Sequence, residues 1–203
     1  MLKIKNLSKS YDGIKVIDNL SISLFDKEKR IGVFGANGCG KTTLFDCICG
    51  LVKYSGEISF NNSILPKDLL SVSKLGVQRT FQRPNVFKSL TIDDHAKISD
   101  KQTVEVFKKF LPNVSLNKKA GSLSFGQQKI LELALVESQN PKLILFDEPF
   151  AGINEKLSKE ISKHIFEQEY YAFIIEHDVD TLKSISDKVF EIRQGKIFSH
   201  VWF

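Results

Sequence analysis

The stretch that decides the fold is IGVFGANGCGKTT, residues 31–43. It matches the pattern G-x-x-x-x-G-K-[ST] in full. Arg30–Phe34 reads as a short buried strand, Lys41–Cys49 as the helix after the loop, and Gly50 suits the end of that helix. Strand, glycine loop and helix in this order are what the pattern requires. They predict an α/β fold with a mainly parallel sheet.

The residue types of this loop point to phosphate binding. Its glycines let backbone N–H groups turn toward phosphate oxygens, and the helix N-terminus adds partial positive charge. We expect Lys41 to reach the β- and γ-phosphates, the Thr42 hydroxyl to bind Mg²⁺, and Thr43 to contact the α-phosphate. The alternative is a glycine-rich structural turn. The residues expected around the nucleotide are Gly35, Asn37, Gly38, Cys39, Gly40, Lys41, Thr42 and Thr43.

A second motif is LILFDEP, residues 143–149, in which four apolar residues precede two carboxylates. This order is typical of a central parallel strand whose carboxyl end lies where open α/β sheets bind ligands. Asp147 is expected to hold Mg²⁺, and Glu148 to orient and deprotonate the attacking water. Alone, the pattern also fits a solvated strand end. Its combination with the glycine loop favours catalysis.

Composition narrows the class of protein. Of the 203 residues, 42% are hydrophobic and 26% charged, which is ordinary for a soluble domain. No apolar run approaches the roughly 18 residues that span a bilayer, and the N-terminus is too polar for a signal peptide, so we expect a cytoplasmic protein. The three cysteines form neither a metal-ligand pattern nor a disulfide framework. The net charge of +5 leaves nucleic acid and anionic membranes open as partners.

Two alternatives within the phosphate-loop proteins can be compared. GTPases read guanine with N-K-x-D, and the nearest string here, NKKA at residues 117–120, lacks the aspartate. The segment LSFGQQK, residues 123–129, precedes Asp147 by about twenty residues, with a helix and an Asn-Pro break between them. In order and spacing it resembles the LSGGQ signature of the ATP-binding subunits of ABC transporters.

Further segments resemble that family's motifs, in the family's order and over essentially the whole chain. They are Tyr11 in SKSYDG (8–13), Gln82 in QRTFQRP (78–84), AGIN (151–154) and His177 in IIEHD (174–178). Alone, Tyr11 could be a surface aromatic, Gln82 a polar loop residue, and His177 a helix-start residue. Within the family resemblance, Tyr11 stacks on adenine, Gln82 touches Mg²⁺ and the water, and His177 reads the γ-phosphate.

The resemblance implies the chemistry and the partners. The catalytic residues would be Lys41, Gln82, Glu148 and His177, and the metal site Thr42, Gln82 and Asp147. Ser124, Gly126 and Gln127 would close over the ATP of a second ATPase subunit, identical or different. The expected cofactors are ATP and Mg²⁺. Expected partners are a membrane permease and, optionally, a substrate-binding protein, without nucleic acid, on the cytoplasmic face of the membrane.

The resemblance also implies the architecture: a single domain with an N-terminal antiparallel part and an inserted helical lobe. The core would be residues 1–83 and 139–203, and the lobe 84–138. Further expected strands are Glu57–Phe60, Gly76–Gln78 and Lys196–Phe203. In the lobe, Thr91 would cap one helix, and Val104, Phe107 and Leu111 would form the apolar stripe of another.

Two points qualify the family resemblance. Phe125 in the signature, the AGIN segment and the IIEHD string resemble the branched-chain amino-acid uptake group. The lobe is short, because 41 residues separate Gln82 from Ser124, and Asn154 stands where many members have Asp. The leading hypothesis is an ATPase that drives a transporter. The alternatives are a soluble ABC ATPase acting on nucleic acid or ribosomes, and a degenerate ATP-binding module with a structural role.

Overall fold

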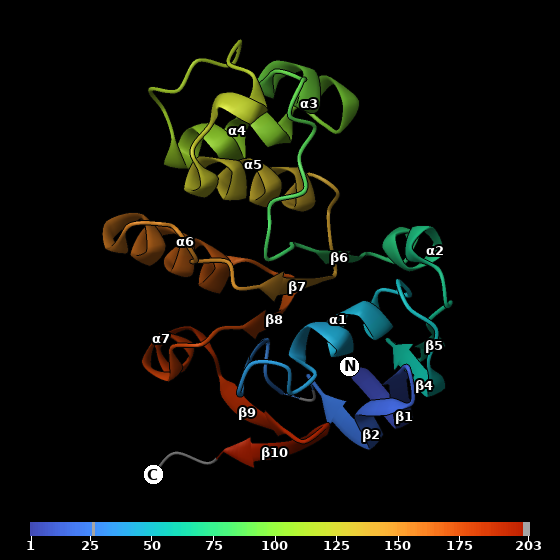
Figure 1. Cartoon of the computed structure of the whole chain (residues 1–203). Coiled ribbons are helices and arrows are strands. Elements are labelled where there is room, and N and C mark those ends of the chain that lie inside the picture. The colour runs from blue at the N-terminus through green and yellow to red at the C-terminus, as the bar shows by residue number, and fades with distance from the viewer. Residues whose placement is uncertain (26, 201–203) are drawn as a thin grey trace.

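The computed structural model describes residues 1–25 and 27–200, which form two β-sheets (Figure 1). The antiparallel sheet has the order β2-β1-β4-β5. Its strands are β1 (Leu2–Tyr11), β2 (Ile14–Leu24), β4 (Ser55–Phe60) and β5 (Ser63–Ile64). The larger sheet has the order β10-β9-β3-β8-β7-β6, and every neighbouring pair except β9 and β10 is parallel. Its strands are β3 (Arg30–Phe34), β6 (Val77–Arg79), β7 (Leu143–Asp147), β8 (Tyr171–Ile175), β9 (Lys188–Arg193) and β10 (Lys196–His200).

Helices cover both faces of the parallel sheet. They are α1 (Lys41–Ile48), α2 (Leu69–Lys74), α3 (Ile92–Ile98), α4 (Gln102–Phe110), the 3₁₀ turn η1 (Ala120–Ser122), α5 (Phe125–Glu137), α6 (Glu155–Glu167) and α7 (Val179–Ile185). In Figure 1, α3, α4 and α5 form the upper part of the molecule, and α1 lies between the two sheets. The expected α/β class, antiparallel N-terminal part and helical segment are therefore confirmed.

Strand β7 shows why the parallel strands are almost wholly apolar. Leu143 and Leu145 join the apolar cluster that contains α1 and the antiparallel sheet. Ile144 and Phe146 join the cluster that contains α5 and α6. Successive side chains of a strand point to opposite faces, and here both faces are covered. A continuous hydrophobic run is the pattern that such a strand requires.

The strand order places the expected motifs at one edge of the sheet. Strands β3, β8, β7 and β6 are consecutive and parallel, so their carboxyl ends lie side by side. The glycine loop follows β3, His177 follows β8, Glu148 follows β7 and Gln82 follows β6. Residues up to 142 positions apart in the sequence thereby meet at the edge where α/β sheets bind ligands.

Two expectations for the helical segment need correction. The buried face of α4 is formed by Val106, Phe107 and Phe110, whereas Val104 and Leu111 are only half-buried. The buried face differs from the expected one because α4 packs against α5. Its buried positions begin at Thr103 and follow at intervals of three and four residues, which share one side of a helix. Residues 84–91 and 111–119 are not helical. The division of the chain into 1–83 with 139–203 and 84–138 stays a prediction.

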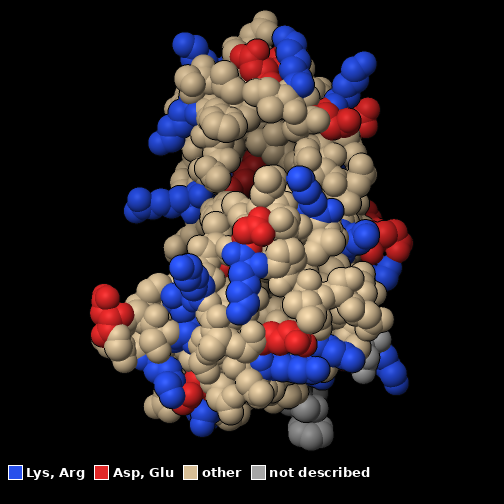
Figure 2. Space-filling view, turned by 90° about the vertical axis from the view of Figure 1, so that its right-hand side faces the viewer, with Lys and Arg blue, Asp and Glu red and all other residues tan. Residues whose placement is uncertain are grey.

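The C-terminal strand and the surface complete the fold. Strand β10 ends at His200, and the remainder of the expected strand, residues 201–203, lies outside the described residues. None of the helices within 1–25 and 27–200 is both long and apolar enough to cross a lipid bilayer. On the face shown in Figure 2, lysines and arginines are interspersed with acidic side chains, and a hollow opens below the helical part.

Candidate functional site

The glycine loop, Gly35–Thr43, encloses the ammonium group of its own lysine. Lys41 Nζ donates to Gly35 O at 2.6 Å and to Ala36 O at 3.0 Å. Gly35 has a φ of 154°, and a Cβ there would lie 2.3 Å from Ile192 O, so no larger residue fits. The loop therefore presents a fixed backbone and a positive charge at the start of α1, an arrangement suited to phosphate oxygens.

Glu148 is the centre of a second cluster. Gln82 Nε2 donates to Glu148 Oε1 and Oε2 at 3.1 and 3.2 Å, and His177 Nε2 lies 2.8 Å from Glu148 Oε1. The three side chains come from the ends of β6, β7 and β8. They share one open pocket with the glycine loop, called here the phosphate pocket. Its lining residues are Asn37, Gly38, Gly40, Lys41, Thr42, Thr43, Gln82, Glu148 and His177. The structure thus brings the four expected catalytic residues together.

Asp147 is more enclosed than the sequence indicates. Its side chain is 1% exposed, and Oδ2 accepts a hydrogen bond from Arg79 Nη2 at 2.8 Å. Arg79 also pairs with Asp46 of α1. Burial raises the pKa of Asp147, and the hydrogen bond and charge of Arg79 oppose that shift. Within the described residues, the other oxygen of Asp147, Oδ1, has no hydrogen-bond partner.

The surroundings of Asp147 fit a divalent cation with hard oxygen ligands. Thr42, Gln82 and Asp147 line one pocket, next to the phosphate pocket. A hydroxyl, an amide oxygen and a carboxylate are the donors that Mg²⁺ takes from proteins, together with phosphate oxygens. The unpartnered, buried Asp147 Oδ1 supplies an acceptor that a cation would satisfy.

Tyr11 lies beside the glycine loop at the end of β1. Its hydroxyl is within hydrogen-bonding reach of the Thr43 side chain. The ring is partly exposed, and Lys9 Nζ lies 4.3 Å from the ring centroid. The structure therefore places the expected adenine-stacking residue next to the residue expected at the α-phosphate.

The signature residues are in a different place. Ser124 and Gln127 form a capping box at the start of α5, in which Ser124 Oγ accepts from Gln127 N and Gln127 Oε1 accepts from Ser124 N. A Cβ on Gly126 would lie 2.8 Å from Gly152 O, so this glycine permits close packing on the segment after Glu148. None of these three residues lines the phosphate pocket of the same chain.

Comparison with known proteins gives the family. The family model described as ABC transporter matches residues 17–151. The chain belongs to the ABC transporter family. The high-affinity branched-chain amino acid transport ATP-binding protein LivG of Escherichia coli K12 is 27% identical, over 96% of this chain and 89% of that protein.

Solved structures agree with this assignment. A nucleotide-free ATP-binding cassette from an ABC transporter has a TM-score of 0.84 at 28% identity, over 98% of this chain and 90% of the other. The ADP conformation of such a cassette has a TM-score of 0.81 at 29% identity, over 98% and 89%. The expected family and fold are confirmed: the chain is an ABC ATPase of the transporter type, and it binds and hydrolyses ATP.

Sequence reasoning missed three charged residues around the site. Arg79, Lys129 and Glu132 are all buried in this family fold. Arg79 and Lys129 lie inside the quoted segments 78–84 and 123–129, but those motifs give them no role, and Glu132 is a single charge between Leu131 and Leu133. The spacing of Lys129 and Glu132 was the available clue, because residues three apart share a helix face and the neighbouring positions are hydrophobic.

Proposed function

We propose that this ABC ATPase hydrolyses ATP in the phosphate pocket, with Glu148 as the general base, and thereby drives a membrane transporter. The observation that carries the proposal is the convergence of Gln82 and His177 on the Glu148 carboxylate, in the same pocket as Lys41 and Thr42. These contacts fix the orientation of the Glu148 carboxylate, and a general base must be held within reach of the proton that it takes from water.

The neighbouring residues would divide the work. The glycine-loop N–H groups and Lys41 bind and neutralise the phosphates, and Thr43 contacts the α-phosphate beside Tyr11, whose ring stacks on adenine. His177 and Gln82 orient Glu148 and the attacking water. Thr42, Gln82 and Asp147 would hold Mg²⁺, which when bound neutralises charge on the phosphate oxygens.

A second ATPase subunit would complete each site. Ser124, Gly126 and Gln127 lie outside the phosphate pocket of their own chain, at the N-terminus of the 13-residue helix α5. Helix N-termini attract anions, so this end would contact the γ-phosphate held by another copy. Exchange of this segment between two subunits requires a two-fold arrangement.

The similarity to known transport proteins suggests a class of transported substrate and no single compound. The similarity to LivG of Escherichia coli supports uptake of branched-chain amino acids or similar compounds. The partners would be a membrane permease, with the ATPase on its cytoplasmic face, and a substrate-binding protein. The family relatives are transporter proteins, which supports this role over an ATPase acting on nucleic acid.

The decisive variant is Glu148→Gln. We expect it to bind ATP as tightly as the wild type, to lose turnover, and to accumulate a dimer, because substrate remains where the base is missing. ATP binding, phosphate release and the mass of the particle in solution measure these three properties. Glu155→Gln, at an exposed position of α6, is the matched control. Turnover that persists in Glu148→Gln shows that another group is the base.

A further inference from the structure

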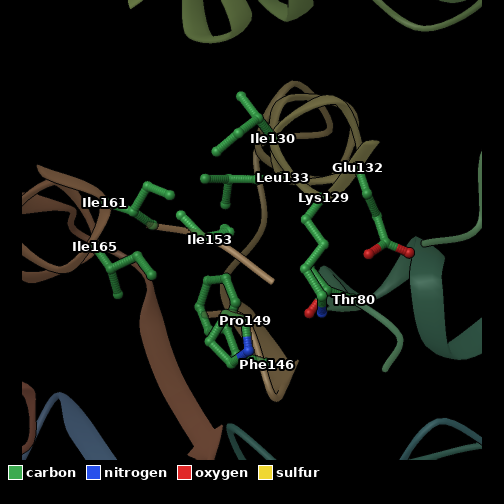
Figure 3. A pocket seen from close by; sticks show the side chains of 10 residues that line it. All are labelled: Thr80, Lys129, Ile130, Glu132, Leu133, Phe146, Pro149, Ile153, Ile161 and Ile165. Atoms are coloured by element: carbon green, nitrogen blue, oxygen red, sulfur yellow. The ribbon is translucent and has the colours of Figure 1, made fainter. Parts of the chain in front are cut away.

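Helix α5 carries two buried charged side chains that contact the backbone beside its own chain's phosphate pocket. Lys129 and Glu132 lie one turn apart and are only 5% and 3% exposed. Figure 3 shows both, with Thr80, on one side of a small cavity, and Ile161 and Ile165 on the other. Burying a charge is costly unless it makes hydrogen bonds, so the partners of these two groups indicate what they do.

Glu132 holds the segment that contains Gln82. Its two carboxylate oxygens accept from Phe81 N, both at 3.3 Å, and Oε1 also accepts from Asn85 N at 2.9 Å. These backbone groups lie on either side of Gln82 in the non-helical stretch after β6. One carboxylate therefore fixes both ends of the stretch 81–85, called here the Gln82 segment.

Lys129 joins this segment to the residue expected to be the base. Its Nζ donates to Glu148 O at 2.8 Å and more weakly to Phe81 O at 3.4 Å. Glu148 has a φ of 51°, which a non-glycine residue adopts only when its surroundings hold it there. The ammonium group thus supports a strained residue and the Gln82 segment together.

We propose that Lys129 and Glu132 are positioning residues. From helix α5, which begins with the signature segment, they hold Glu148 and Gln82 in their places relative to each other. Their side chains touch the backbone of the site. The inference rests on the proposed function, because it assigns the two residues to hydrolysis at that pocket. The proposal also makes α5 a direct connection between two ATP sites. Its N-terminus would contact the ATP bound by the second subunit, and its next turn holds the general base of its own chain.

The chain offers a matched pair of variants on this helix. Glu137 is also buried on α5, at 6% exposure, but it accepts from Tyr170 Oη at 2.6 Å and pairs with His164 Nε2 at 2.8 Å. Glu132→Gln keeps the shape of the side chain but replaces one carboxylate oxygen with an NH₂ group. That group cannot accept a hydrogen bond, so at least one of Phe81 N and Asn85 N loses an acceptor oxygen. Glu137→Gln makes the same chemical change away from the phosphate pocket.

We expect Glu132→Gln to lower kcat about tenfold with an ATP Kd close to that of the wild type, because one lost hydrogen bond loosens the catalytic geometry. Lys129→Met should lower kcat similarly, and the double variant should lose less than the product of both effects, because the two act on one segment. Glu137→Gln should lower the unfolding temperature and leave kcat unchanged. Equal kcat in Glu132→Gln and Glu137→Gln overturns the proposal.

Amide hydrogen exchange tests the positioning without relying on turnover. In Glu132→Gln the Phe81 and Asn85 amides should exchange about tenfold faster, whereas Glu137→Gln should leave them as in the wild type. Unchanged exchange at both amides in Glu132→Gln contradicts the proposal. A wild type without ATP turnover would instead contradict the proposed function, while the exchange result still decides whether Glu132 holds the segment.

Discussion

At the scale of single residues, the aromatic in the signature segment has a structural reason. The Phe125 ring lies against Gly152, where a Cβ would come within 2.7 Å of the ring carbon Cδ1. Gly152 has a φ of 72°, so glycine is favoured there by conformation as well as by space. The ring remains 44% exposed, and Lys129 Nζ lies 5.6 Å from its centroid. Phe125 therefore supports the turn after Glu148 from the signature helix.

Phe125→Ala should lower the free energy of unfolding by about 1–2 kcal/mol, less than for a fully buried aromatic, and reduce turnover several-fold. Phe125→Leu should keep most of the stability and most of the turnover, because leucine still packs against Gly152. Denaturant titration and phosphate release measure the two effects. Phe198→Ala, a partly exposed ring beside Arg193, is the control. Equal turnover in Phe125→Ala and the wild type would leave the ring without a role in activity.

At the scale of elements, burial shifts the pKa values of two charged side chains on α5. Burial raises the pKa of Glu132 to about 7, against the hydrogen bonds from Asn85 and Phe81 and the charges of Lys129 and Arg79. Burial also lowers the pKa of Lys129, which faces Glu176, Glu148 and Asp147 as well as Glu132. The helix thus carries a carboxyl group whose charge changes near neutral pH, directly on the Gln82 segment.

The sign of the effect on stability follows from linkage. The folded state keeps the Glu132 proton up to about pH 7, whereas the unfolded chain loses it near the ordinary value of 4.5. The contribution of this group to stability is therefore largest at low pH and falls as pH rises from about 4.5 to 7, by at most about 3.4 kcal/mol. Denaturation of the wild type and Glu132→Gln at pH 5 and pH 8 tests this. Relative to the wild type, the free energy of unfolding of the variant should be higher at pH 8 than at pH 5. A difference that is the same at both pH values contradicts the prediction.

At the scale of the whole molecule, the fold places the phosphate pocket and the signature residues, both needed for ATP hydrolysis, in separate parts of the chain's surface. The phosphate pocket lies at the carboxyl ends of β3, β8, β7 and β6, and the signature residues lie at the start of α5, outside it. Two subunits related by a two-fold axis would form two composite sites, each with a glycine loop from one chain and a signature segment from the other.

Mixing two inactive variants tests this arrangement. Lys41→Ala removes the phosphate-binding lysine, and Ser124→Arg places a bulky side chain at the signature segment, so each variant alone should be inactive. In an equal mixture, half of the dimers would be mixed and would contain one intact site, which restores about a quarter of wild-type turnover. Phosphate release measures the recovery. A mixture as inactive as its components contradicts exchange between identical copies.

The sequence by itself determined the motifs and much of the fold. The glycine loop, the strand that ends in Asp147 and Glu148, and the capped start of α5 are each written in adjacent residues, because local backbone conformation and hydrophobic periodicity need no distant partner. Their order along the chain was enough for the resemblance to ABC ATPases. The apolar face of α4 was displaced from the expected one, because the packing of α4 on α5 decides which positions are buried.

Only the tertiary structure decided how the site is held. The contacts of Arg79 with Asp147, of Glu132 with Phe81, and of Lys129 with Glu148 join residues 68, 51 and 19 positions apart. A single charged residue in a sequence does not say whether it faces water or a buried partner. That depends on the strand order and on how α5 packs against β7 and the segment after β6. A buried charge is costly without a partner, so each of these charges requires the one it has.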